Sequence, residues 1–235
     1  MIKSKNAKTE DMIVDSMTYD DILKLFWEDK RIFVNRKLQE NINRLKPKVK
    51  KSLNTKRLFF KPLEYESPMG FHYVIQFFNN GIGVKADERL GVFYFAWYRQ
   101  GRNINAITLT LLEKQVWHET IYTSHFLSRY RERYLKDMSL EKHEVMLRYL
   151  LNNMKKTIMK VEIKSETHPG EFWSDGPDGL CFGKHLHDFV VEMKTFISWD
   201  MAHMDQKEFA LRSKDFMKSK GLDLLLPEDE FADIV

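Results

Sequence analysis

Residues 92–112 read VFYFAWYRQGRNINAITLTLL, and apolar or aromatic residues recur there at every second position. Phe93, Phe95 and Trp97 fall on one face of an extended chain, and the ITLTL run that follows alternates in the same way. Between the two runs, residues 100–103 supply glycine and asparagine, which favour a tight turn. The stretch therefore predicts two antiparallel strands joined by a hairpin.

The period of two extends outward over residues 57–122 and predicts a mainly antiparallel sheet. The expected strands in this part are 58–65, 72–78, 92–98, 104–112 and 116–122. A second group of strands is separated by the turn signals HPG and GPDG. Its expected members are 157–163, 171–173, 180–182 and 189–197.

Helical spacing appears on both sides of the strands. Thr18 is the expected N-cap of a first helix. A second helix carries one apolar stripe at spacings of four, four and three and is expected to end near Pro47; the stripe comprises Val34, Leu38, Ile42 and Leu45. Three more helices are expected over 124–135, over 139–153 with Ser139 as its cap, and over 200–218.

Because the strands are grouped and do not strictly alternate with helices, the predicted fold class is α+β. It has an N-terminal helical segment, flanking helices and a C-terminal helix. The expected parts are a disordered tail over 1–17, basic helices with a sheet over 18–123, a helix–helix–strands–helix part over 124–220, and an acidic tail over 221–235. No clean boundary separates the two middle parts, so one continuous domain is the alternative.

The charge of the chain is unevenly distributed. Residues 1–160 carry a net charge of +12, and residues 161–235 carry −8. Within residues 24–61, 13 Lys and Arg face three Asp and Glu. This density favours an anionic partner, RNA or another nucleic acid, and the expected contacts are Lys46, Lys48, Lys50 and Lys51. The alternatives are a solvated helix face, or one that docks on the acidic part of the same chain.

Several functional classes are excluded by what the sequence lacks. No apolar run approaches the roughly 20 residues of a membrane-spanning helix, and the start of the sequence lacks a secretory signal. A cytoplasmic protein without a membrane partner is therefore expected. Cys181 is the single cysteine, which excludes an internal disulfide framework. No phosphate-binding loop or dinucleotide fingerprint is present, so no cofactor is predicted.

Residues 122–134 read YTSHFLSRYRERY and hold the most informative polar cluster. At 100° per residue, four of its side chains share an arc of about 100° on a helix: His125, Arg129, Glu132 and Arg133. The apolar side is expected to face the core; it comprises Phe126, Leu127, Tyr130 and Tyr134.

Metal-free RNA cleavage needs a base, an acid and positive charge at the phosphate, and this cluster contains candidates for each. His125 is the expected acid or base, and Arg129 and Arg133 are the expected phosphate ligands. Glu132 is expected to act as a base or to orient the arginines. The alternative is structural, because Arg129 and Glu132 can form an ordinary ion pair along the helix.

The motif His125-x3-Arg129-x2-Glu132-Arg133, at the start of a helix that is followed by a second helix and strands, resembles the ribonuclease toxins of bacterial toxin–antitoxin modules. The resemblance is to the BrnT-like group within the RelE-like set and covers at most residues 117–198. It implies a small α+β ribonuclease core with these four residues in its helix motif. The toxins are much smaller than this chain, and the resemblance does not explain residues 1–116.

His185 and His187 alternate along an expected strand and could bind a metal ion together with His168 or His203. Two histidines without a second spaced pair are unspecific, so no metal is predicted. The resulting hypothesis is an RNA-directed protein with the character of a metal-independent, toxin-like ribonuclease. Its alternatives are a nonenzymatic nucleic-acid-binding protein, and an adaptor that recruits a protein partner or forms a homo-oligomer.

Overall fold

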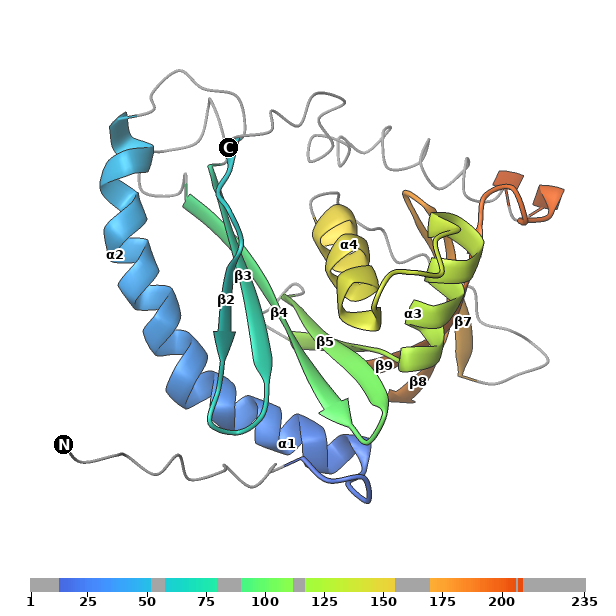
Figure 1. Cartoon of the computed structure of the whole chain (residues 1–235), viewed down its shortest axis with the longest axis horizontal. Helices are drawn as coiled ribbons and strands as arrows, with labels where there is room; N and C mark the ends of the chain where they lie inside the picture. Colours follow the sequence, from blue (N-terminus) through green and yellow to red (C-terminus); the bar gives the residue numbers. More distant parts are fainter. Residues whose placement is uncertain are drawn as a thin grey trace. The chain divides into compact units, whose positions relative to one another are not determined.

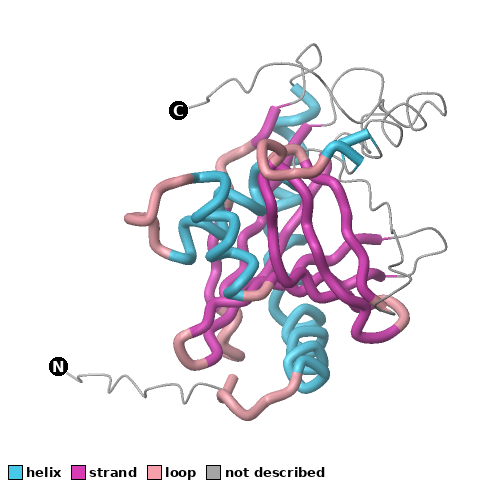
Figure 2. The backbone as a smooth tube through the Cα atoms, turned by 90° about the vertical axis from the view of Figure 1, so that its right-hand side faces the viewer, coloured by secondary structure: helices cyan, strands magenta, loops and turns pink. Residues whose placement is uncertain are grey.

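The computed structural model describes residues 13–51, 58–79, 90–111, 117–154, 170–205 and 207–208. Helices and strands both contribute to this part of the chain, which confirms the α+β class (Figure 2). The described residues divide into two units, one ending at Asn103 and one beginning at Ile104. The division falls at the start of β5, earlier than the boundary expected after residue 123.

The first unit begins with α1 (Tyr19–Asp29), which continues through the π-helical turn η1 (Lys30–Val34) into α2 (Asn35–Lys51). Thr18 is the N-cap, as predicted. Its hydroxyl oxygen accepts a hydrogen bond from the Asp21 amide, and the Asp21 carboxylate accepts one from the Thr18 amide at 3.0 Å. This reciprocal pair satisfies two amides that the helix start leaves without a partner.

The predicted helix end near Pro47 is wrong, because α2 passes through Pro47 and ends at Lys51. A proline inside a helix removes one backbone hydrogen bond. The apolar stripe compensates for that loss, since Leu45 is buried against Ile75 and Phe77. Tertiary packing therefore supports the helical turn that leads into Pro47.

The strands of the first unit are β1 (Leu58–Phe59), β2 (Leu63–Glu66), β3 (His72–Asn79) and β4 (Leu90–Gln100). β3 pairs antiparallel with each of the other three. The single strand predicted over 58–65 is wrong, because β1 and β2 are separate. Pro62 lies between them and has no amide hydrogen to donate to β3.

The helices of the first unit cover one face of these strands. Figure 1 shows α2 running beside β2, and α1 at the end where the β2–β3 hairpin turns. Phe26 of α1 packs on Phe71 and Tyr73, with ring centroids 5.7 and 6.2 Å apart. Asp29 is buried in the same contact, and its carboxylate accepts a hydrogen bond from the Tyr73 hydroxyl at 2.9 Å. One face of α1 is thus buried in the core, and the opposite face lies on the surface.

The strands of the second unit are β5 (Asn103–Leu111), β6 (Trp117–Tyr122), β7 (Glu171–Gly176), β8 (Gly179–His187) and β9 (Val190–Ser198). Their order is β5-β6-β9-β8-β7. β6 and β9 are parallel, and the other neighbours are antiparallel. The predicted mainly antiparallel pairing is confirmed.

The helices of the second unit are α3 (Ser124–Tyr130), its π-helical extension η3 (Arg131–Leu135), and α4 (Lys142–Met154). The bounds predicted for the first of these, 124–135, are confirmed. The predicted cap Ser139 is wrong, because the Asp137 carboxylate accepts hydrogen bonds from the Ser139 amide and hydroxyl and closes a turn there. α4 begins three residues later in the chain, at Lys142.

Four predictions concern residues that are largely outside the described ranges. The tail expected over 1–17 is described only from residue 13, and the acidic tail expected over 221–235 lies outside these ranges. The strand expected over 157–163 lies outside them. The helix expected over 200–218 is described only through residue 208, where 204–205 and 207–208 are helical. In the described part of the chain, every helix is too short or too polar to cross a bilayer.

Candidate functional site

The start of α3 is fixed to two strands of its own unit. The Thr123 hydroxyl donates to the Met193 carbonyl of β9 at 3.1 Å and accepts from the Phe126 amide at 3.1 Å. The Ser124 amide donates to the Asn105 side-chain oxygen of β5 at 2.9 Å. These bonds set the direction in which α3 leaves the sheet, and they leave the next residue, His125, exposed.

The inner face of α3 is packed as predicted for Phe126, Leu127 and Tyr130, each at most 1% exposed. The prediction for Tyr134 is wrong, because its side chain is 41% exposed. Tyr134 lies in η3, where the π-helical turn changes the angle between successive side chains from that of a regular helix. Its ring still stacks on Tyr130, with centroids 5.2 Å apart.

The outer face of α3 and η3 carries the four predicted site residues. Arg129 Nη1 lies 2.7 Å from Glu132 Oε2 in an ion pair. This hydrogen bond and the charge of Arg129 lower the pKa of Glu132, and the charges of Arg133 and His125 lower it further. Glu132 is therefore an ionised acceptor at neutral pH, within electrostatic reach of the other three side chains.

Arg133 is turned toward the sheet. Its Nη1 atom donates a hydrogen bond to the Phe196 carbonyl of β9 at 2.6 Å. The contact brings one guanidinium edge against the backbone and leaves the side chain half-buried. Of the predicted cluster, the structure thus joins Arg129 to Glu132 directly and anchors Arg133 on β9, while His125 stands at the solvent-facing start of the helix.

A buried carboxylate behind α3 was not recognised in the sequence. Asp178, in the turn between β7 and β8, accepts hydrogen bonds from the Tyr130 hydroxyl at 2.8 Å and from the Asn152 and Asn153 amides at 3.3 and 3.4 Å. Burial raises the pKa of Tyr130, and the charge of Asp178 raises it further. Asp178 therefore positions α3 and α4 together. In the sequence, the only local feature that marks Asp178 is its position in the GPDG turn.

Three of the four histidines considered as metal ligands lie in the described part of the chain, and His168 lies outside it. The His185 ring packs on Phe172, with centroids 5.1 Å apart, and His187 is exposed. Among the described residues, no three His, Cys, Asp or Glu side chains are placed to hold a metal ion. Burial raises the pKa of Cys181 to about 12, and its sulfur lies 3.2 Å from the Tyr149 hydroxyl. A neutral buried thiol of this kind is a core residue.

The four predicted nucleic-acid contacts all lie in α2. Lys46 is exposed, and the side chains of Lys48, Lys50 and Lys51 lie outside the described part of the chain. Other cations lie along α1, η1 and α2; most are exposed, and Lys30 and Lys37 are half-buried. We call this set the basic outer face; it comprises Lys24, Lys30, Arg31, Arg36, Lys37, Arg44 and Lys46.

The acidic side chains of this helical segment offset only part of its positive charge. Glu40 lies 3.2 Å from Lys37 Nζ and 3.9 Å from Arg36 Nε. Asp29 faces the core, where burial raises the pKa of its carboxyl. The outer face consequently keeps an excess of cations.

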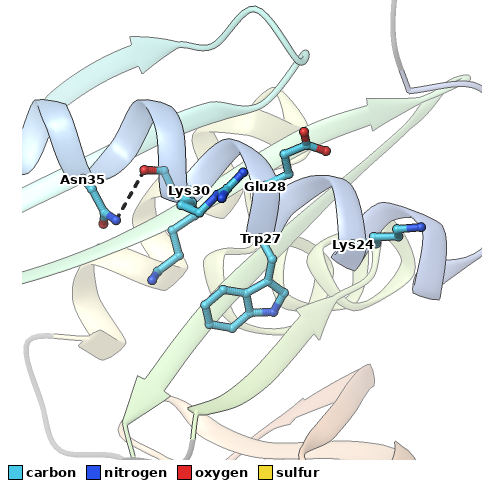
Figure 3. Close-up of a pocket in the computed structure, with 6 residues that line it drawn as sticks. Lys24, Trp27, Glu28, Lys30 and Asn35 are labelled. Atoms are coloured by element: carbon cyan, nitrogen blue, oxygen red, sulfur yellow. Dashed lines mark hydrogen bonds between the residues drawn. The ribbon is translucent and has the colours of Figure 1, made fainter.

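A surface hollow of about 550 Å³ lies on the outer face of α1 and η1. We call it the Trp27 hollow; its lining residues are Lys24, Trp27, Glu28, Lys30, Arg31 and Asn35 (Figure 3). Lys30 Nζ lies 4.6 Å from the centroid of the Trp27 ring. Burial lowers the pKa of Lys30. The lining positions 24, 27, 28, 31 and 35 are spaced by three, one, three and four residues, as on one helix face. This spacing is the sequence signal from which the hollow could have been predicted.

Comparison with protein-family models, with curated proteins and with solved structures finds no match to this chain. The chemistry of its own residues is therefore the basis for any assignment of function. Two surfaces offer such chemistry: the basic outer face with the Trp27 hollow in the first unit, and the His125 cluster in the second.

Proposed function

We propose that this protein binds RNA through the basic outer face. The observation that carries the proposal is the excess of cations, most of them exposed, along the helical segment α1–η1–α2, whose apolar side chains pack on the core. Residues 24–61 hold 13 Lys and Arg against three Asp and Glu. Such a surface attracts a polyanion over a distance comparable to the Debye length, about 10 Å at 0.1 M salt.

The packing of α2 supports this interpretation over a purely structural role for the cations. Leu45 is buried against Ile75 and Phe77, and Leu38 and Ile42 pack on the same cluster. These apolar contacts hold the helix in place. Two cations add to these contacts, because Arg44 donates to the side-chain oxygen of Asn41 at 2.7 Å and Lys37 Nζ lies 5.3 Å from the centroid of the Tyr65 ring. The cations also repel one another where they are closely spaced. A phosphate backbone would relieve this repulsion.

A matched pair of double variants tests the proposal. Arg36→Gln with Lys46→Gln removes two exposed charges from the basic outer face, of which Arg36 forms a surface ion pair with Glu40. The control, Lys136→Gln with Lys194→Gln, removes two charges from the second unit, where both lysines form surface ion pairs. We expect a loss of several-fold to about tenfold in the affinity for a labelled RNA with the first pair. Equal affinity of the two double variants would overturn the proposal.

Metal-independent RNA cleavage at the His125 cluster is a second candidate function. The specific observation is an exposed histidine on the same helix face as an ionised Glu132 and the paired Arg129. In this proposal a base takes the proton of a 2′-hydroxyl, whose oxygen attacks the phosphorus. An acid then protonates the departing 5′-oxygen, and Arg129 and Arg133 offset the phosphate charge. The helix motif resembles that of the BrnT-like toxins.

Cleavage of labelled structured and single-stranded RNAs in the presence of chelator tests this candidate. His125→Ala and Arg129→Ala should each abolish most of the activity, while Arg148→Ala, an exposed arginine on α4, should not. Equal traces of activity in all of these proteins would assign the cleavage to a contaminant or another site. Binding without cleavage would leave the nonenzymatic function, and the absence of both would favour an adaptor.

We further propose that the protein acts in the cytoplasm. Two observations support this location: the only cysteine is a buried thiol, and RNA is the proposed partner. Microscopy of a fluorescent fusion tests it, and an enrichment at the cell envelope would contradict it.

A further inference from the structure

The Trp27 hollow combines two kinds of side chain that a single nucleotide can use at once. An aromatic ring stacks on a base, and neighbouring cations bind its phosphates. Trp27 supplies the ring, and its indole is half-buried. Lys24 and Arg31 are exposed at the same hollow, and Lys30 Nζ lies 4.6 Å from the ring centroid.

The remaining lining residues do not oppose such a ligand. Figure 3 shows the Glu28 carboxylate pointing away from the Trp27 ring. Asn35 donates from its side-chain nitrogen to the Arg31 carbonyl at 3.4 Å, across the π-helical turn η1. The Trp27 side of the hollow is therefore apolar at the ring and positive around it.

The desolvation of Lys30 adds a second reason to expect an anion here. Burial of this ammonium group disfavours its charged form and lowers its pKa. A phosphate placed beside the Lys30 ammonium group would favour its charged form and so offset the effect of burial. An acidic peptide could supply the negative charge, but a carboxylate offers no ring that could stack on the indole.

We propose that the Trp27 hollow is a base-stacking site for single-stranded RNA. One unpaired base lies on the Trp27 indole, and the adjoining phosphates bind Lys24, Lys30 and Arg31. The single-stranded form is favoured because bases inside a duplex present no free ring face. This inference rests on the proposed RNA-binding function and names the part of the basic outer face that distinguishes unpaired from paired RNA.

Substitution of Trp27 separates stacking from charge. Trp27→Leu removes the aromatic ring without removing a charge. We expect it to weaken the binding of a short single-stranded RNA by about tenfold to a hundredfold. The dependence of affinity on salt should stay as in the parent protein, because the phosphate contacts are kept. Trp27→Phe keeps a ring and should retain most of the affinity. Circular dichroism must first show that both variants fold like the parent.

Substitution of Lys30 gives the complementary result. Lys30→Gln should reduce the salt dependence of the single-stranded complex by about 0.7 in log–log slope, the value of one phosphate contact. It should leave quenching of Trp27 fluorescence by bound RNA in place. The sequence holds five tryptophans, so the Trp27 signal is taken as the difference between the parent and Trp27→Phe.

Three outcomes would contradict the account, and they distinguish failure of this inference from failure of the proposed function. If the parent protein binds neither single-stranded nor duplex RNA, the proposed function itself is wrong. If the parent binds RNA but Trp27→Leu binds it equally well, the stacking site is wrong and RNA binding by the basic outer face stands. Equally tight binding of an oligoglutamate of matched charge would also overturn the stacking site and point to an acidic protein partner.

Discussion

The Tyr130 hydroxyl donates a 2.8 Å hydrogen bond to the Asp178 carboxylate, between residues 48 positions apart in the sequence. The bond ties α3, which carries the His125 cluster, to the turn between β7 and β8. Asn152 and Asn153 of α4 donate to the same carboxylate. Three buried or half-buried donors therefore depend on one acceptor.

Removal of this acceptor should destabilise the second unit strongly. Asp178→Ala leaves the Tyr130 hydroxyl without its acceptor, and an unpaired buried donor costs about 1–3 kcal/mol. With the two asparagine amides also affected, we expect the free energy of unfolding to fall by about 3 kcal/mol or more. Urea denaturation measures it. The control is Asp188→Ala in the exposed turn between β8 and β9, which should change little.

The exposure of Tyr134 leads to a second prediction. Tyr134→Ala should cost less than about 1 kcal/mol, because this ring is already 41% exposed. Tyr130→Ala, at a residue 1% exposed, should cost about 3–5 kcal/mol. Thermal or urea unfolding of the two variants provides the comparison. Similar losses for both would mean that η3 keeps the regular helical phase and buries Tyr134.

The fold was predictable from the sequence where local signals and tertiary packing agree. The alternation of apolar residues predicted β3 and β4, and Thr18 predicted the start of α1. It was not predictable where the structure departs from a local signal: α2 continues through Pro47, two residues after the buried Leu45, and η3 leaves Tyr134 exposed. Ser139 was misassigned because an Asx turn and a helix cap use the same residue types.

The candidate site was predictable only along one helix. The ion pair of Arg129 and Glu132 follows from their spacing on a single turn. The anchoring of Arg133 on Phe196, and of α3 on Asp178, joins segments far apart in the chain. Such contacts leave no periodic pattern in a single sequence. The Trp27 hollow has a periodic signal in the sequence, but the lysine run after residue 45 is a denser charge signal at the other end of the helical segment.

Asp29 gives a prediction about pH. Burial raises the pKa of its carboxyl above the usual value near 3.8, so the folded protein holds this proton more tightly than the unfolded chain does. The contribution of Asp29 to stability is therefore greatest at low pH, and it declines as the pH rises from 3.8 through the raised pKa. Asp29→Asn should remove this decline. Unfolding free energies of both proteins, measured across acidic pH, check the sign; parallel curves would contradict it.

Glu132 gives a prediction for the cleavage candidate. Its pKa is lowered by Arg129, so it stays ionised until the pH falls below its ordinary value of 4.5. Any acidic limb of a pH–rate profile between pH 5 and 8 must then belong to another group. Glu132→Gln should reduce the rate and leave the position of that limb unchanged. A shift of the limb in Glu132→Gln would instead assign the titration to this carboxylate.

The most direct test of RNA binding by the basic outer face is the affinity of the parent protein for a labelled single-stranded RNA over a series of salt concentrations. We predict a linear fall of the logarithm of the association constant with the logarithm of salt concentration. The slope should be about −0.7 for each phosphate contact, and therefore about −2 or steeper for three or more cations. An affinity that does not change with salt would contradict the account.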